Sequence, residues 1–228
     1  MKRIVLWLIF LCALGVYAQR PQELNKSDSK YLEDQFYLGI TYNFLLDKPN
    51  DFTQRNLSYG LQGGIIKDIP LNSTRTFAIG VGLGYAVNSY YSNMLASESL
   101  DRVLYEKATE ADNVKRSKIE NHLVEFPLEF RWRDSTPEEY KFWRVYTGIK
   151  LGYVFGSRSK LVAEANKTSF INPDIRKFQY GLMFNFGYNT FNVHIYYSLN
   201  NLFEDGAIFE EEDLKLKPLR VGLIFYIL

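Results

Sequence analysis

The stretch Arg220-Val221-Gly222-Leu223-Ile224-Phe225-Tyr226-Ile227-Leu228 carries the pattern that decides the fold. In an extended chain, successive side chains point to opposite faces, so every second residue lies on the same face. One face of this stretch is wholly apolar and consists of Val221, Leu223, Phe225 and Ile227, whereas the other carries a charge, a glycine and a phenol. A soluble domain must bury such an apolar face. A membrane barrel instead turns that face to lipid and pairs both strand edges by closing the sheet.

The same alternation recurs along the sequence in segments close to the ~9–11 residues with which a tilted strand crosses a membrane. We predict eight strands, at residues 35–46, 58–68, 75–88, 120–132, 142–155, 178–188, 191–199 and 220–228. The third is the clearest, because its large apolar residues alternate with glycine and alanine. A bare inner face fits a narrow lumen filled by long side chains from opposite strands, although a soluble β-sandwich could also use it at a close sheet contact. Arginine at Val81, on the bulky face, should therefore be far more destabilising than serine at Gly82, on the bare face.

The connections alternate in length, with longer ones after the first, third, fifth and seventh predicted strands. This rhythm is typical of a bacterial outer-membrane barrel with both termini in the periplasm and the long loops outside the cell. Aromatic residues make up 16% of the chain, which fits the aromatic girdles of such barrels. We therefore predict an all-β fold, an eight-stranded antiparallel transmembrane β-barrel over residues 35–228.

The N-terminus has the layout of a cleaved secretory signal peptide, residues 1–18. Lys2 and Arg3 precede the apolar run Ile4–Val16, and Val16-Tyr17-Ala18 ends it like a cleavage site. The one cysteine, Cys12, lies inside this segment, so we expect a mature chain without thiols. Residues 19–34 form a polar periplasmic lead-in. Removal of residues 1–18 changes the formal net charge from +1 to −1, which gives no electrostatic reason to expect nucleic acid as a partner.

Two details of the strands and loops are less regular. Pro127 lies within the fourth predicted strand and has no N–H to donate, so it predicts a bulge or a local break in the ladder. Within the polar insert at residues 89–118, residues 97–107 could form a short helix, or the flanking strands could extend instead.

Four aromatic residues of the loops are expected to be exposed, where they could anchor a partner: Tyr90, Tyr91, Phe170 and Phe209.

Charged residues at inward-facing positions are the candidate functional site. They are Glu125, Glu129, Arg131, Arg133, Arg144, Lys150 and Arg220. In an eight-stranded barrel side chains nearly fill the lumen, and buried charges must be paired. The main interpretation is a structural ion-pair network, and the alternative is a small ion-conducting or solute-binding lumen.

A catalytic interpretation is weaker. His194, Ser198 and Glu129 could form a triad on paper, but they belong to the lumen-facing set, whereas a lipid substrate would approach from outside. The acidic run at residues 210–213 lacks the alternating ligands and turn glycine of a calcium loop. We expect no enzyme activity, no catalytic residues, no cofactor and no metal site.

Several stretches resemble the PorT family of outer-membrane β-barrels from Bacteroidota. They are Glu33–Gly39, Lys67–Asn72, Glu125-Phe126-Pro127-Leu128-Glu129-Phe130-Arg131-Trp132-Arg133, Lys141–Arg144, Phe186–Phe191 and Gly222–Leu228. The resemblance implies a non-enzymatic accessory role in the type IX secretion system, with outer-membrane lipid and other translocon proteins as partners, and no catalytic residues. The alternative is a general structural, adhesive or small porin-like outer-membrane barrel.

Overall fold

The computed structural model describes residues 34–99, 102–134, 142–164 and 166–227. The predicted signal peptide and the lead-in up to residue 33 lie outside these residues. The strands are β1 (Asp34–Leu46), β2 (Tyr59–Pro70), β3 (Phe77–Tyr91), β4 (Met94–Glu98), β5 (Val103–Lys107), β6 (Val114–Arg133), β7 (Trp143–Ala163), β8 (Lys167–Ile171), β9 (Phe178–Tyr188), β10 (Phe191–Ser198), β11 (Ile208–Phe209), β12 (Glu212–Asp213) and β13 (Lys217–Ile227), and a short 3-10 helix, η1, spans Glu110–Asp112. None of the described residues belongs to a helix long and apolar enough to cross a membrane.

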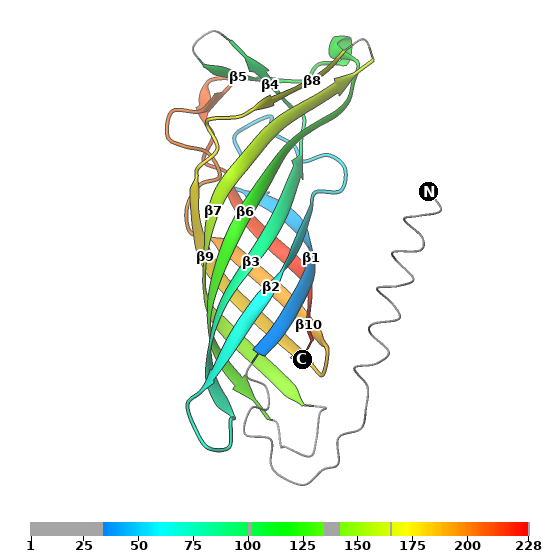
Figure 1. Ribbon diagram of the computed structural model, residues 1–228. Helices are drawn as coiled ribbons and strands as arrows, with labels where there is room; N and C mark the ends of the chain where they lie inside the picture. The colour runs from blue at the N-terminus through cyan, green and yellow to red at the C-terminus, as the bar shows by residue number, and fades with distance from the viewer. Residues whose placement is uncertain (1–33, 100–101, 135–141, 165, 228) are drawn as a thin grey trace, which may run out of the picture. The chain divides into compact units, whose positions relative to one another are not determined.

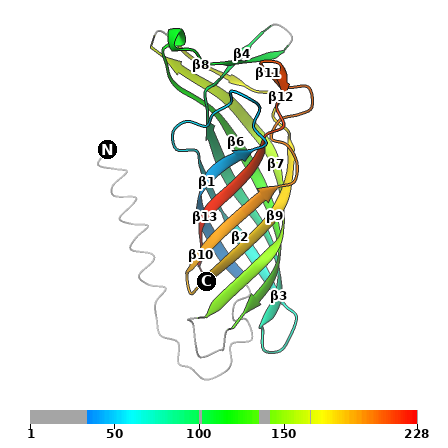
Figure 2. The same ribbon diagram turned by 180° about the vertical axis from the view of Figure 1, so that it is seen from behind.

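Eight long strands of the described chain form a closed antiparallel barrel, which confirms the predicted fold class. They pair in chain order as β1, β2, β3, β6, β7, β9, β10 and β13, and β13 pairs back onto β1. Figures 1 and 2 show these strands tilted around a single closed wall. Closure leaves none of the eight with an unpaired edge along the wall, which is the arrangement that allows strands to cross a bilayer.

The two faces of the wall differ as the alternation predicts. On β9, Phe178, Leu182 and Phe186 are exposed on the outer face, whereas Gln179 and Asn185 are buried in the lumen. The same outer face continues around the barrel, and its aromatic rings pack on one another, as Trp143 does on Phe186 with a centroid separation of 5.3 Å. The barrel therefore presents a continuous apolar belt outward and a polar interior.

The bare inner face of β3 makes room for side chains from neighbouring strands. A Cβ atom on Gly84 would clash with the hydroxyl of Tyr37, which reaches across from β1. At Gly82 a Cβ atom would lie 2.5 Å from Ile66 Cγ1 and 2.8 Å from the Ile65 carbonyl oxygen. Serine at Gly82 should therefore cost more than the bare inner face implies, because the space beside this glycine is already filled. That it costs less than arginine at Val81 stays a prediction.

Pro127 produces a local break and no bulge. The ladder between β3 and β6 contains the pairs Val81–Leu128 and Gly84–Glu125 in one register, but no pair at Pro127. On its other side Pro127 stays in register with Lys150 of β7. The register shifts between β6 and β7 lie elsewhere, between Val114 and Arg116 and between His122 and Leu123.

The two ends of the barrel differ in their connections. We call the end with the tight β2–β3 and β9–β10 turns the turn end and the opposite end, where β4, β5, β8, β11 and β12 gather, the loop end (Figures 1 and 2). The alternative of a helix at residues 97–107 is wrong: β4 and β5 form a hairpin there, and β3, β6 and β7 extend beyond their predicted bounds. The alternation of buried Val103 and Tyr105 with Leu104 and Glu106 accounts for the strand, because only a period of two places both apolar residues on the covered side.

Candidate functional site

All seven predicted lumen charges are buried in the barrel, with 0–4% of each residue exposed. Glu129, Arg131 and Arg133 of β6 lie nearer the turn end and meet partners from β1 and β2. Arg131 contacts Glu129 Oε2 at 2.8 Å through Nε, and Asp68 Oδ1 and Gln35 Oε1 at 3.1 Å each through one terminal nitrogen. Arg133 forms a further ion pair with Asp68. This cluster joins three strands through charge-assisted hydrogen bonds.

Aromatic rings complete the surroundings of Arg131. Its guanidinium carbon lies 4.5 Å from the ring centroid of Tyr146 and 5.3 Å from that of Tyr226. The Tyr226 hydroxyl donates to Glu129 Oε1 at 3.4 Å and accepts from Asn185 Nδ2 at 2.9 Å. A cation enclosed by a carboxylate on one side and aromatic faces on the other is stabilised without water.

A second cluster lies closer to the loop end and is centred on Glu125. One carboxylate oxygen contacts Lys150 Nζ at 3.2 Å, and the other contacts Arg220 at 3.0 Å. Lys150 also donates to Gln62 Oε1 at 2.5 Å, and the Arg220 guanidinium stacks 3.8 Å from the ring centroid of Tyr196. Glu125 thereby links β6, β7 and β13.

Arg144 differs from the other lumen cations. Among the described residues it has no carboxylate partner, and two of its nitrogens have no hydrogen-bond acceptor. Its guanidinium carbon lies 4.5 Å from the ring centroid of Phe142 and 6.0 Å from that of Tyr226. The buried charges described in the lumen are three carboxylates and five cations, so the interior carries an excess of positive charge.

Asp68 is the member of the site that the predicted set omits. It is 1% exposed and pairs with both Arg131 and Arg133. The signal for it was in the sequence, since Asp68 shares the inward face of β2 with Gln62. An inward carboxylate facing a strand that carries two inward arginines could have been assigned as their partner.

The residues of the possible triad are not brought together by hydrogen bonds. His194 Nδ1 lies 2.5 Å from Asn185 Oδ1, and the Ser198 hydroxyl donates to the Asn200 carbonyl at 2.9 Å. Glu129 is occupied by Arg131 and Tyr226. Within the described residues, no group of three His, Cys, Asp or Glu side chains has an arrangement that could hold a metal ion. The arrangement cross-links strands and fills the lumen.

The loop end is closed by an apolar cluster, which we call the cap. Its buried members include Phe52, Met94, Tyr105, Ile175, Leu202, Phe203, Phe209, Leu214 and Leu216. Ring contacts join segments far apart in sequence, such as Phe52 with Phe209 at 5.8 Å and Tyr105 with Phe203 at 5.4 Å between centroids.

The expectation that the loop aromatics are exposed is wrong. Tyr90 and Phe209 are 2% and 1% exposed, Tyr91 is buried at 9%, and Phe170 packs against the cap. These rings are buried within the loop end. Their apolar surface stabilises the connections there, so it is not available to an external partner.

Polar contacts fasten the cap from several sides. The Tyr105 hydroxyl lies 3.0 Å from Asn172 Oδ1 and 2.9 Å from Asp174 Oδ2. Burial raises the pKa of the Tyr105 phenol above its ordinary value, so the hydroxyl stays protonated and available to donate. Lys107 pairs with Asp51 at 2.5 Å, and the Asn50 backbone N–H donates to Glu212 Oε2 at 3.2 Å. The connections of the loop end therefore form one folded unit.

The sequence was compared with family models, with curated proteins and with solved structures. Residues 17–204 match the family model described as "Outer membrane protein beta-barrel domain". No curated protein matches the sequence. Among solved structures, the chain is similar to Ail, the attachment invasion locus protein of Yersinia pestis, at 11% identity and a TM-score of 0.34, over 86% of this chain and 98% of that one. It is also similar to a triple mutant of the Rhodopseudomonas blastica porin, at 8% identity and a TM-score of 0.22, over 85% and 99% of the two chains.

The family match covers most of the sequence, and it assigns the barrel to an outer membrane. A barrel in that membrane needs a closed wall and an apolar outer belt, and the eight-stranded wall described above has both. The chain belongs to the outer membrane protein β-barrel domain family.

Proposed function

We propose that this protein is a non-enzymatic accessory component of the type IX secretion system that acts by contact with other translocon proteins. The observation that carries the mechanism is the filled and capped lumen: its charged side chains are 0–4% exposed, and an apolar cluster covers the loop end. A barrel packed in this way offers exported cargo no passage, so a secretion role must be exerted through its surfaces. The assignment to type IX secretion is supported by the PorT-like stretches, above all Glu125–Arg133.

In this proposal the turn end faces the periplasm and the loop end faces the outside of the cell. The tight turns at one end and the longer, folded connections at the other are the arrangement that bacterial barrels share. Contact with translocon proteins then occurs through the cap, the outer wall or the periplasmic end.

The test is the culture-supernatant proteome of a strain that lacks the gene, compared with the same strain carrying the gene on a plasmid. We expect loss of the cargo proteins that bear the type IX export signal, and their return with the plasmid. Crosslinking in the complemented strain should then recover translocon proteins with the barrel. Unchanged secretion in the strain that lacks the gene would refute the role.

A second candidate is an adhesive barrel whose cap binds an external partner, and a cavity in the cap favours it. This cavity has a volume of about 540 Å³, and its lining combines Arg102 and several apolar residues with five carboxylates, those of Glu106, Asp174, Glu204, Asp205 and Glu210. Cells carrying Glu106→Gln and Glu210→Gln together should lose binding to a basic surface while cargo secretion stays normal. A small porin-like role is tested separately by single-channel conductance of the purified barrel in a planar bilayer.

A further inference from the structure

The wall of the barrel continues past the apolar belt on one side, where β6, β7 and β8 pair beyond the other strands (Figure 1). Cross-strand partners share a face of the sheet, so the register arranges the outward residues in rows. From the belt toward the loop end, the rows are Glu120 with Arg158 and Ile171, Lys118 with Lys160 and Ser169, and Arg116 with Val162 and Lys167. We call these three rows the basic face.

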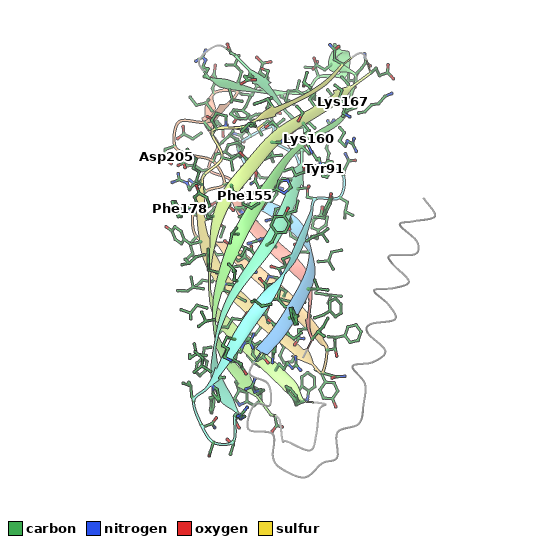
Figure 3. All side chains as sticks on the ribbon, viewed as in Figure 1. Tyr91, Phe155, Lys160, Lys167, Phe178 and Asp205 are labelled. Atoms are coloured by element: carbon green, nitrogen blue, oxygen red, sulfur yellow. The ribbon has the colours of Figure 1, made fainter. Side chains whose placement is uncertain are left out.

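The basic face begins where the aromatic part of the belt ends. His122 lies two residues from Glu120 on β6, on the belt side of the first row, and its Nδ1 lies 2.6 Å from the Tyr85 hydroxyl. The ring centroids of Phe155 and His122 lie 6.2 Å apart, and 58% of Phe155 is exposed. Figure 3 shows Phe155, Lys160 and Lys167 progressively nearer the loop end. Each row adds two residues, roughly 7 Å along the strand, so the cations lie at the depth where lipid headgroups meet water.

Most of the positive charge on this face is not neutralised. Lys118 Nζ and Lys160 Nζ both contact Glu120 at 2.5 Å, so one carboxylate serves two ammonium groups. Within the described chain, Arg116, Arg158 and Lys167 form no ion pair, and the nearby Glu164 pairs with Lys115 at 3.5 Å. Five cations therefore face one carboxylate across the three rows.

A cavity in the same face is lined by hydrogen-bond donors. It has a volume of about 370 Å³, and its lining includes Arg116, Lys118, Lys160, Lys167, Thr168 and Ser169. No carboxylate belongs to its described lining. Guanidinium, ammonium and hydroxyl groups that converge without an acceptor of opposite charge suit a phosphate, and a guanidinium can hold one through two parallel bonds.

We propose that the basic face binds the phosphate groups on the headgroup of an outer-leaflet lipid. The lipid source follows from continuity: the cavity lies on the same outward face as the apolar belt, so a lipid whose acyl chains lie along Phe155 and Tyr85 carries its headgroup to the basic rows. The lipid phosphates then supply the negative charge that no described protein group provides to Arg116, Arg158 and Lys167. This site is independent of the secretion role, but its assignment to the outer leaflet rests on the proposed orientation of the loop end.

The experiment uses the full barrel in detergent, with bound lipid counted by native mass spectrometry. The probes are a bisphosphorylated lipid A and the same lipid after removal of both phosphates. The test variant combines Arg116→Gln, Lys160→Gln and Lys167→Gln, which leaves Lys118 paired with Glu120. A control variant combines Lys48→Gln, Arg102→Gln and Lys215→Gln, which removes the same charge from exposed positions elsewhere at the loop end.

We expect the wild-type barrel and the control variant to bind the phosphorylated lipid at least tenfold more tightly than the dephosphorylated one, and the test variant to lose this difference. Should the triple variant not fold, judged by its heat-dependent migration on a gel, Lys167→Glu alone should reduce the preference by several-fold. Equal binding of the two lipids by the wild type, or equal losses in both triple variants, would overturn the proposal. If inorganic phosphate bound saturably and abolished the preference for the phosphorylated lipid, the site would be one for a free anion, and the proposal of a lipid headgroup would be overturned.

Discussion

Arg131 shows how a single residue can be charged and wholly enclosed. It is 0% exposed, yet its guanidinium meets two carboxylates and two aromatic rings. Removing one partner of a buried pair leaves the other charge uncompensated, which costs more than the pair contributes when intact. The lumen therefore tolerates single neutralising changes poorly.

Glu129→Leu should lower the free energy of unfolding by about 3 kcal/mol, because Arg131 loses its 2.8 Å partner in a site that water does not reach. Urea titration of the barrel in lipid vesicles, followed by tryptophan fluorescence, measures this loss. The matched control is Glu164→Leu, whose 3.5 Å pair with Lys115 lies in solvent and should change stability by less than about 1 kcal/mol. Equal stability of the Glu129 variant and the wild type would show that this carboxylate does not hold Arg131.

Gly84→Ala should destabilise the barrel by about 1–3 kcal/mol, because the added Cβ atom meets the Tyr37 hydroxyl. Among the residues that the structure describes, that hydroxyl has no hydrogen-bond partner, so Tyr37→Phe alone should be nearly neutral. Combining the two changes should recover part of the lost stability in the same urea titration. A double variant no more stable than Gly84→Ala would place the strain elsewhere.

At the scale of the strands, the alternation in the sequence predicts most of the wall. β9 has the predicted bounds, and the inward parity of β6 and β7 places the lumen charges correctly. A period of two is decisive here because lipid and lumen impose opposite requirements on successive residues.

The connections were harder to predict, for a physical reason. The cap depends on contacts between residues such as Phe52 and Phe209, whose separation in sequence gives no local signal. Likewise, Tyr90 and Phe209 look exposed in polar inserts, and only the folded loop end reveals what covers them. The pairing of Asp68 with two arginines of β6 depends in the same way on closure of the wall.

Leu128→Arg tests the outer belt. Leu128 is 51% exposed on β6, between the outward residues Val124 and Trp132, and arginine there should cost about 2–4 kcal/mol if lipid surrounds it. Leu57→Arg is the control, since Leu57 is 66% exposed just before β2 at the loop end and should lose no more than about 1 kcal/mol. The loss is measured as the change in unfolding free energy in vesicles. Similar losses for the two leucines would contradict the assignment of the belt.

For the whole molecule, the proposed orientation makes a direct prediction. The sequence has one cysteine, Cys12, inside the predicted signal peptide, so introduced cysteines can be labelled selectively. In intact cells, a membrane-impermeant maleimide should label Ser97→Cys at the loop end and should not label Ser73→Cys in the β2–β3 turn. Both should react after the cells are broken. The reverse pattern in intact cells would mean that the barrel is inserted the other way round.

The seam of the barrel joins β1 to β13 through eleven register pairs, from Phe36–Ile227 to Leu46–Lys217. The pairing along this edge of β1 can therefore form only once β13, the last strand of the wall, is in place. Contacts of such large sequence separation form slowly, and until they do the chain exposes two open edges that can pair with other chains. A helper that holds these edges apart during insertion would set the pace of biogenesis, and a chain cut short before β13 would be prone to aggregation and degradation.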